Sequence, residues 1–158
     1  MNKKLLVLAL TLSFVGVNVF YCEPMAQASE KQVAMQQNVV NTTSLEVVNN
    51  PTKFLNKTIS MQATFDKFST LGLDYKKALR ESNKYIGILI QRDDVVDHNI
   101  PLSEMKLFLN KDLAQKYIDI DCGDKISITG KVFSTALGDP WIDIEKINVI
   151  KKAQKSEK

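Results

Sequence analysis

DCGDKISITGKVFSTALGDPWIDIEKINVI, residues Asp121 to Ile150, is the stretch of sequence that decides the fold. In its first part, apolar residues alternate with polar ones at Ile126, Ile128 and Val132. This alternation predicts a strand with one buried face. Gly130 stands within the strand and has no side chain, which is typical of a place where another backbone approaches closely.

The second part of the stretch predicts another strand, from Trp141 to Ile150. Its apolar residues fall at Ile142 and Ile144 and then shift by one position to Ile147 and Val149. Such a change of parity indicates a β-bulge, which lets a strand coil around a small barrel.

A turn between the two strands is predicted at Gly138-Asp139-Pro140. Glycine and proline both favour turns, and a proline at the start of a strand removes no hydrogen bond from the sheet. We therefore expect the two strands to lie side by side in one sheet.

The same alternation predicts three earlier strands. They cover Thr58 to Phe68, Tyr85 to Arg92, and a segment that carries Met105, Leu107 and Leu109. In the first of them the apolar parity changes near Asp66, which again indicates a bulge or a bend.

Helices are predicted at three places between or before these strands. Ser44 is a candidate N-cap for a short N-terminal helix, and Asn110 for a second helix from Lys111 to Asp119. Asp74 to Glu81, in the long connection after the first strand, has the composition of a third helix. The apolar stripe of the second helix comprises Leu113, Ala114, Tyr117 and Ile118.

Three segments resemble the oligonucleotide/oligosaccharide-binding fold, the OB fold, including exported bacterial domains whose role is uncharacterised. They are Asn50 to Ile59, Gly123 to Val132, and Trp141 to Ile147. The resemblance implies a five-stranded Greek-key barrel with a helix between strands three and four, preceded by a short N-terminal helix. It covers residues 44–150, which we expect to form one all-β domain with a few helices.

The resemblance also implies a ligand-binding face on strands two and three, flanked by the loops that join strands one to two and four to five. Aromatic and cationic side chains in these places could stack on bases or sugars. In the alternative interpretation, Trp141 covers one end of the barrel, and Tyr85 and Phe108 pack beneath the long connection. The candidate ligand-binding residues are Tyr75, Lys76, Lys77, Arg80, Tyr85, Phe108 and Trp141.

Residues 1–28 have the pattern of a signal peptide. A basic start is followed by the apolar run Leu5 to Tyr21 and by Ala26-Gln27-Ala28, a small-x-small cleavage site. The alternative is a retained membrane anchor, because about 17 apolar residues are close to the minimum that spans a bilayer. Lipid attachment at Cys22 is disfavoured by the bulky residue before it. We expect an exported protein, periplasmic or secreted, with a flexible lead-in at residues 29–43.

Few residues are suited to catalysis or metal binding. After signal cleavage Cys122 is the single cysteine, which we expect to be buried, with intermolecular pairing as the alternative. His98 is the only histidine. The loop that carries Asp93, Asp94, Asp97 and His98 lacks the spacing and the glycine of a calcium loop. We therefore predict no cofactor, no metal and no enzymatic activity.

The charge of the domain is close to neutral. The whole chain has a net charge of +3, whereas residues 29–150 carry 15 basic and 16 acidic side chains, and a basic tail follows at 151–158. A broad basic face for phosphate binding is not indicated. We predict an exported, non-catalytic binding module for a protein, a glycan or a small polar ligand. The alternative is a single-stranded nucleic-acid-binding protein that uses Lys76, Lys77, Arg80, Tyr85 and Phe108.

Overall fold

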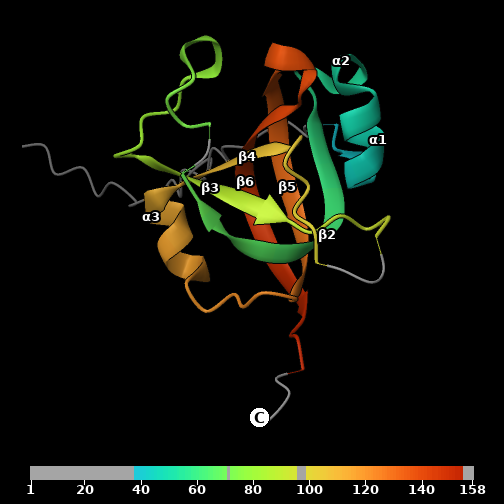
Figure 1. Ribbon diagram of the computed structural model, residues 1–158, viewed down its shortest axis with the longest axis vertical. Helices are drawn as coiled ribbons and strands as arrows, with labels where there is room; N and C mark the ends of the chain where they lie inside the picture. Colours follow the sequence, from blue (N-terminus) through green and yellow to red (C-terminus); the bar gives the residue numbers. More distant parts are fainter. Residues whose placement is uncertain (1–37, 71, 96–98, 155–158) are drawn as a thin grey trace, which may run out of the picture. The chain divides into compact units, whose positions relative to one another are not determined.

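The computed structural model describes residues 38–70, 72–95 and 99–154. Five of its strands are long enough to form a barrel, and a two-residue strand, β1, precedes them (Figure 1). The strands are β1 Val40–Asn41, β2 Thr58–Ser69, β3 Tyr85–Ile90, β4 Lys106–Asn110, β5 Lys125–Ser134 and β6 Trp141–Lys151.

The order of strand pairing closes the barrel. Along the sheet the order is β1-β2-β3-β4-β6-β5, and β5 pairs back with β2. The β4–β6 pair is parallel, and the other four pairs of the barrel are antiparallel. This is the Greek-key topology of the OB fold, so the predicted fold class is confirmed. The expectation that the last two strands are neighbours is confirmed as well, from Lys125 opposite Lys151 to Ser134 opposite Trp141.

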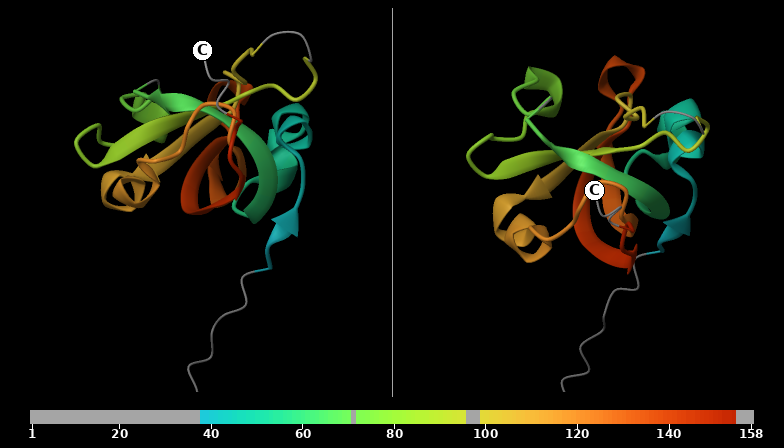
Figure 2. Two further views of the ribbon diagram at one scale, coloured as in Figure 1. Left: turned by 90° about the horizontal axis from the view of Figure 1, so that it is seen from below. Right: turned by 60° about the horizontal axis from the view of Figure 1, so that its bottom comes forward.

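Both predicted bulges are present. In β2 the register with β3 shifts between Phe65 and Lys67, which leaves Asp66 unpaired in that ladder. In β6 the residue opposite Thr129 is Lys146 and the residue opposite Gly130 is Ile144, so one residue is extra. A bulge increases the local twist of a strand, and these two allow long strands to curl into a small barrel (Figure 2).

Gly130 lies in β5 directly against the backbone of β6. A Cβ atom at this position would come within 2.5 Å of the carbonyl oxygen of Asp143 and 3.0 Å of the Ile142 side chain. The glycine predicted to allow close approach is therefore required by the backbone of the neighbouring strand.

Two short helices, α1 Ser44–Asn49 and α2 Pro51–Phe54, lie on one side of the barrel (Figure 1). The predicted N-terminal helix is confirmed, but its N-cap is Thr43, whose hydroxyl accepts a hydrogen bond from the Glu46 backbone N–H. Ser44 is instead a buried first helical residue, and its hydroxyl donates to Asp93 at 3.3 Å.

The helix between β4 and β5 is shorter than predicted. α3 covers Lys111–Ala114, and a 3₁₀ turn, η2, continues through Gln115–Tyr117. Asn110 caps α3, as predicted, by accepting a hydrogen bond from the Asp112 N–H. The tighter 3₁₀ turn changes the direction of the following side chains, so Ile118 is 72% exposed and does not join the apolar stripe. Leu113, Ala114 and Tyr117 do pack against the core.

The described chain begins inside the predicted lead-in. Val40 and Asn41 pair in parallel with Ile59 and Ser60 of β2, so these residues belong to the sheet and are not a flexible segment. The predicted signal peptide, its cleavage site and the anchor alternative all lie outside the described residues. Among the described helices, none has the length and apolarity needed to cross a membrane.

Asp124 joins the start of β5 to the residues that follow β6. Its buried carboxylate accepts hydrogen bonds from the N–H groups of Asp121 and Ala153 and forms an ion pair with Lys152 at 2.8 Å. Burial raises the pKa of Asp124, but the bonds from Lys152, Ala153 and Asp121 outweigh it and lower the pKa to about 2. Lys152 and Ala153, which follow β6, are therefore bound to the start of β5.

Cys122 is exposed, which corrects the prediction that it is buried. It lies in the turn before β5, where the backbone of the next residue, Gly123, bonds to Phe65. Its exposed thiol donates to the carboxylate of Asp66 in β2 at 3.8 Å and accepts from the side-chain amide of Gln91 at 3.6 Å.

Substituting Gly130 with alanine is expected to destabilise the barrel by about 2 kcal/mol, because β5 and β6 must separate to admit the methyl group. Urea unfolding measures the effect. Gly138→Ala is the matched control: that glycine has φ of 83° but nothing within 4 Å of the added Cβ, so only the backbone strain of about 1 kcal/mol remains. Equal losses in the two variants would contradict the close contact.

The low pKa of Asp124 predicts a specific acid sensitivity. The folded state favours the ionised carboxylate, so its contribution is complete above the pKa of the unfolded chain, near 3.9, and is lost as pH falls towards 2. Asp124→Asn should lower the free energy of unfolding at pH 7 by about 2 kcal/mol and flatten its pH dependence between pH 5 and 2. Urea unfolding at several pH values tests this. Asp74→Asn, an exposed control, should keep the wild-type slope.

Candidate functional site

A second cluster of buried side chains lies on the outer side of the barrel, where the OB resemblance implied a ligand-binding face. The β2–β3 loop and the β5–β6 loop, residues 135–140, extend from the same end of the barrel (Figure 1). Residues 72–84 of the first loop and Ala136 of the second supply side chains that pack with Phe108 of β4 and Trp141 at the start of β6. The buried members are Leu73, Ala78, Phe108 and Trp141, with Tyr75, Tyr85, Phe133 and Ala136 packed around them.

Three aromatic rings form a continuous stack in this cluster. The ring of Tyr75 stacks on Trp141 at 5.2 Å between centroids, and Trp141 stacks on Phe108 at 5.7 Å. The indole N–H of Trp141 donates to the carbonyl of Ala136 at 2.7 Å. Trp141 and Phe108 are each only 1% exposed. The alternative interpretation, in which Phe108 packs beneath the long connection, describes the structure.

Arg80 fastens the β2–β3 loop to the barrel. Its guanidinium forms two hydrogen bonds with the carboxylate of Asp143, at 2.8 and 2.5 Å, and lies 3.7 Å from the ring centre of Phe133. The bond with Asp143 raises the pKa of Arg80. The cation is therefore neutralised within the chain, and its planar face is already in contact with an aromatic ring.

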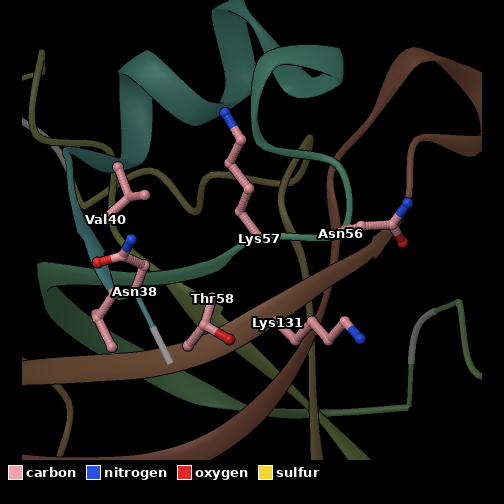
Figure 3. Close-up of a pocket in the computed structure, with 7 residues that line it drawn as sticks. Asn38, Val40, Asn56, Lys57, Thr58 and Lys131 are labelled. Atoms are coloured by element: carbon pink, nitrogen blue, oxygen red, sulfur yellow. The ribbon is translucent and has the colours of Figure 1, made fainter. Parts of the chain in front are cut away.

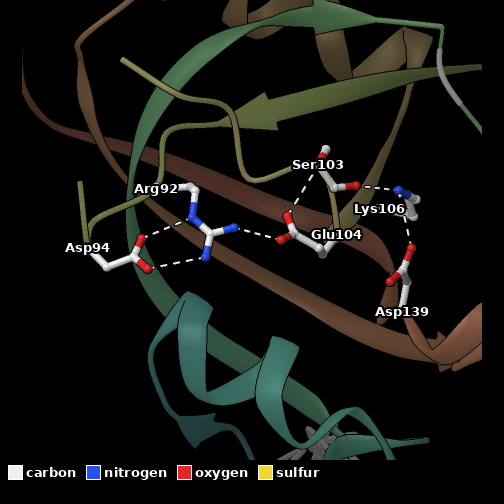
Figure 4. A network of polar contacts seen from close by, with 6 residues as sticks. All are labelled: Arg92, Asp94, Ser103, Glu104, Lys106 and Asp139. Atoms are coloured by element: carbon white, nitrogen blue, oxygen red, sulfur yellow. Dashed lines mark hydrogen bonds and ion pairs between the residues drawn. The ribbon is translucent and has the colours of Figure 1, made fainter. Parts of the chain in front are cut away.

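A polar network fastens the β5–β6 loop to the segment before β4 (Figure 4). Lys106 forms an ion pair with Asp139 at 3.3 Å and donates to the carbonyl of Ser103. Glu104, which follows Ser103 in the chain, accepts a hydrogen bond from Arg92 at 2.6 Å. Both loops over the face are therefore held by charged groups as well as by the aromatic stack.

Arg92 also binds the acidic loop that sequence reasoning considered for metal binding. It donates two hydrogen bonds to the carboxylate of Asp94, at 3.0 and 3.1 Å, which raises the pKa of Arg92 and lowers that of Asp94. Within residues 38–70, 72–95 and 99–154, no three acidic, histidine or cysteine side chains are grouped to hold a metal. Asp97 and His98 lie outside the described residues.

The predicted site residues are thus divided between two environments. Tyr75, Arg80, Tyr85, Phe108 and Trp141 come together in the cluster or at its rim. Lys76 and Lys77 are exposed on the β2–β3 loop.

The helix expected in this loop is a single 3₁₀ turn, η1 Lys76–Ala78. Asp74 does not cap it. The loop follows its tertiary contacts instead, because Tyr75 is drawn onto Trp141 and Ala78 is buried.

Two exposed leucines lie at this face, and neither is among the candidate ligand-binding residues predicted from the sequence. Leu79 is 50% exposed on the β2–β3 loop, and Leu137 is 72% exposed on the β5–β6 loop. Leu137 also has φ of 62°, a left-handed conformation that costs a residue with a Cβ about 1 kcal/mol. The sequence does carry a signal for Leu137: an apolar residue directly before Gly138 in a predicted turn indicates an exposed apolar side chain.

Comparisons with known proteins identify structural neighbours only. The sequence matches no known family profile, and no curated protein matches it at a significant level. Among solved structures, the chain is similar to a protein described as an aspartyl-tRNA synthetase from Leishmania major Friedlin, with 9% identity and a TM-score of 0.48 over 81% of this chain.

Two further structures are similar at the same level. Asparaginyl-tRNA synthetase from Pyrococcus horikoshii has 13% identity and a TM-score of 0.47 over 71% of this chain. The chain spans 23% of the length of each of the two synthetases. OBody AM3L09, solved bound to hen egg-white lysozyme, has 12% identity and a TM-score of 0.44, covering 64% of this chain and 88% of that one. The fold assignment rests on the barrel topology itself.

Burial of the face that carries Tyr75, Phe108 and Trp141, here called the covered face, can be tested by the fluorescence of Trp141, the only tryptophan of the chain. Because its ring is buried between Tyr75 and Phe108, we expect blue-shifted fluorescence that acrylamide quenches weakly. Tyr75→Ala should increase the quenching and lower stability by about 1 kcal/mol. Tyr117→Ala, which removes a tyrosine packed on the main core, should lower stability without increasing the quenching. Strong quenching in the wild-type protein would contradict the covered face.

Proposed function

We propose that this protein is an exported, non-catalytic binding module that contacts a protein partner through the two loops over the barrel face. The observation that carries the proposal is the aromatic stack of Tyr75, Trp141 and Phe108, which fills the face with the chain's own side chains. A ligand could stack on these rings only if the β2–β3 loop moved away from the barrel. The outer surface of the two loops, in contrast, is accessible to a partner without any such movement.

The loop surface combines apolar and cationic groups. Leu79 and Leu137 are exposed, and Lys76 and Lys77 lie on the same loop as Leu79. In the described part of the chain neither lysine forms an ion pair. Because lysines attract carboxylates and exposed leucines favour apolar contact, the partner segment is acidic and apolar. Strain at Leu137 supports this, since strained residues cluster at functional positions.

Export and the absence of catalysis are parts of the same proposal. The pattern of residues 1–28 supports cleavage after Ala28, which would leave Ser29 as the first residue. The expected observation is a mature N-terminus at Ser29, measured by mass spectrometry of the protein recovered outside the cytoplasm. An intact leader would favour the anchor alternative.

Site-specific photo-crosslinking in cells that produce the protein tests the partner surface. A crosslinker at position 79 or 137 should give a discrete protein adduct, whereas one at position 118 should not, although Ile118 is as exposed as Leu137. Lys76→Glu with Lys77→Glu should weaken the adduct at position 137 by about tenfold, the effect of losing two exposed ion pairs.

Two outcomes would contradict a protein partner. One is an equal adduct pattern at all three positions, or no adduct at any. The other is tight binding of single-stranded DNA at low salt that Lys76→Gln with Lys77→Gln abolishes, since the electrostatic part of nucleic-acid binding is strongest there. The second result would favour nucleic-acid binding, for which the exposure of both lysines beside Tyr75 is the supporting observation.

A further inference from the structure

The outer face of the β2–β5 pair has an unusual and regular composition. Because Ile59, Met61 and Ala63 point into the core, the residues between them point outward. The same alternation applies to β5. The residues of this parity form four cross-strand pairs: Thr58 with Lys131, Ser60 with Thr129, Gln62 with Ser127, and Thr64 with Lys125. Thr58 and Thr64 are themselves buried, so the accessible groups are those of the other six residues. Hydroxyl and amide groups therefore occupy the middle, and a lysine lies at each end.

A row of cavities follows this face. The first, of about 540 Å³, is lined by Asn38 and Val40 on the β1 side, by Lys57, and by Lys131 of β5 (Figure 3). It lies at the start of β2, beside the first of the four cross-strand pairs.

The second and third cavities continue towards the other end of the same strands. The second, of about 570 Å³, is lined by Thr43, Gln62, Asp93 and Ser127 among others. The third, of about 380 Å³, shares Gln62 and Asp93 with it and reaches Lys125. Seven residues of strand from Thr58 to Thr64 extend about 20 Å. The second and third cavities adjoin at Gln62 and Asp93, and the first lies at the other end of the same strand pair. Together the three cavities make up the surface named the groove.

The groove is positively charged. In the ranges that the structure describes, Lys57, Lys131 and Lys151 form no ion pair. Lys125 donates only to the hydroxyl of Thr64. Asp93 is the single carboxylate that lines the three cavities. Unpaired lysines at both ends favour an anionic ligand that extends along the groove.

We infer that this groove binds a linear polyanion rich in hydroxyl groups, such as an acidic polysaccharide or a polyol phosphate chain. The hydroxyl and amide groups of Ser60, Gln62 and Ser127 can both donate and accept hydrogen bonds, which suits sugar or polyol hydroxyls. Among the described residues, no aromatic side chain lines the three cavities, so nucleic-acid bases would find no ring there on which to stack. The groove shares no lining residue with the loop surface proposed for the protein partner.

Calorimetric titration of residues 29–158 with defined oligogalacturonates and with glycerol phosphate oligomers tests the groove. We expect binding at low salt to at least one of the two, weakening as salt rises. Binding of the first identifies a carboxylated sugar chain, and binding of the second identifies a phosphate-bearing chain. Lys125→Gln with Lys131→Gln should weaken it about tenfold, the effect of two exposed charge contacts.

The matched control removes the same charge elsewhere. Lys76→Gln with Lys77→Gln changes the loop surface and should leave polyanion binding unchanged, whereas the groove variant should leave the crosslinks at positions 79 and 137 unchanged. The two proposals can therefore fail separately. Ser127→Tyr should block the middle of the groove without changing charge, and circular dichroism checks its folding. If that variant does not fold, the lysine variant carries the test.

Four results would overturn the inference, and the first three concern binding by the wild-type protein and by the groove variant. They are no binding of either oligomer at low salt, equal affinity in the wild-type protein and the Lys125→Gln, Lys131→Gln variant, and tighter binding of single-stranded DNA than of both oligomers. Weakening by the loop control to the same extent as by the groove variant would show only a non-specific charge effect and would also overturn it.

Discussion

The buried indole of Trp141 is the interaction on which the surface of this barrel depends. Its ring lies between Tyr75 of one loop and Phe108 of β4, and its N–H binds the carbonyl of Ala136 in the other loop. A large aromatic side chain buries 150–250 Å², so the stack contributes strongly to holding both loops. With Trp141 in this position, the face between the loops is part of the core and not an open groove.

The Gly-Asp pair at the start of β5 has a comparable role at the other end of the strand. The N–H of Gly123 donates to Phe65, and the Phe65 N–H donates to the carbonyl of Asp124, so the turn is bonded to β2 at the bulge. The carboxylate of Asp124 then holds Ala153 and Lys152 after the end of β6. The Gly123-Asp124 pair, part of a segment that resembles the OB fold, therefore has a structural role. Its backbone binds β2, and the carboxylate of Asp124 binds the residues that follow β6, so the start of β5 is connected to both.

The sequence predicted the strands and bulges well because the relevant signal is local. A change of apolar parity near Asp66 or after Ile144 can be seen in a few residues, and the barrel geometry follows from it. Features that depend on tertiary contacts were predicted less well. Ile118 does not join the predicted apolar stripe, because α3 continues as a 3₁₀ turn. Residues 74–81 do not form the helix that their composition predicts, because Tyr75 packs on Trp141. Five of the seven candidate site residues were brought together. Whether the faces of their aromatic rings were free depended on the path of the loop, which alternation does not encode.

The near-neutral net charge of the domain does not mean that its charges are evenly mixed. Arg80 is bound to Asp143, and Arg92 to Asp94 and Glu104, so both arginines are neutralised within the fold. The lysines along β2 and β5 have no such partners in the described residues, and only Asp93 lies among them. A net charge near zero argues against a broad basic face only if the charges are mixed. Here the arginines fasten loops and the lysines line a groove, so one side of the barrel can attract anions although the domain as a whole is almost uncharged.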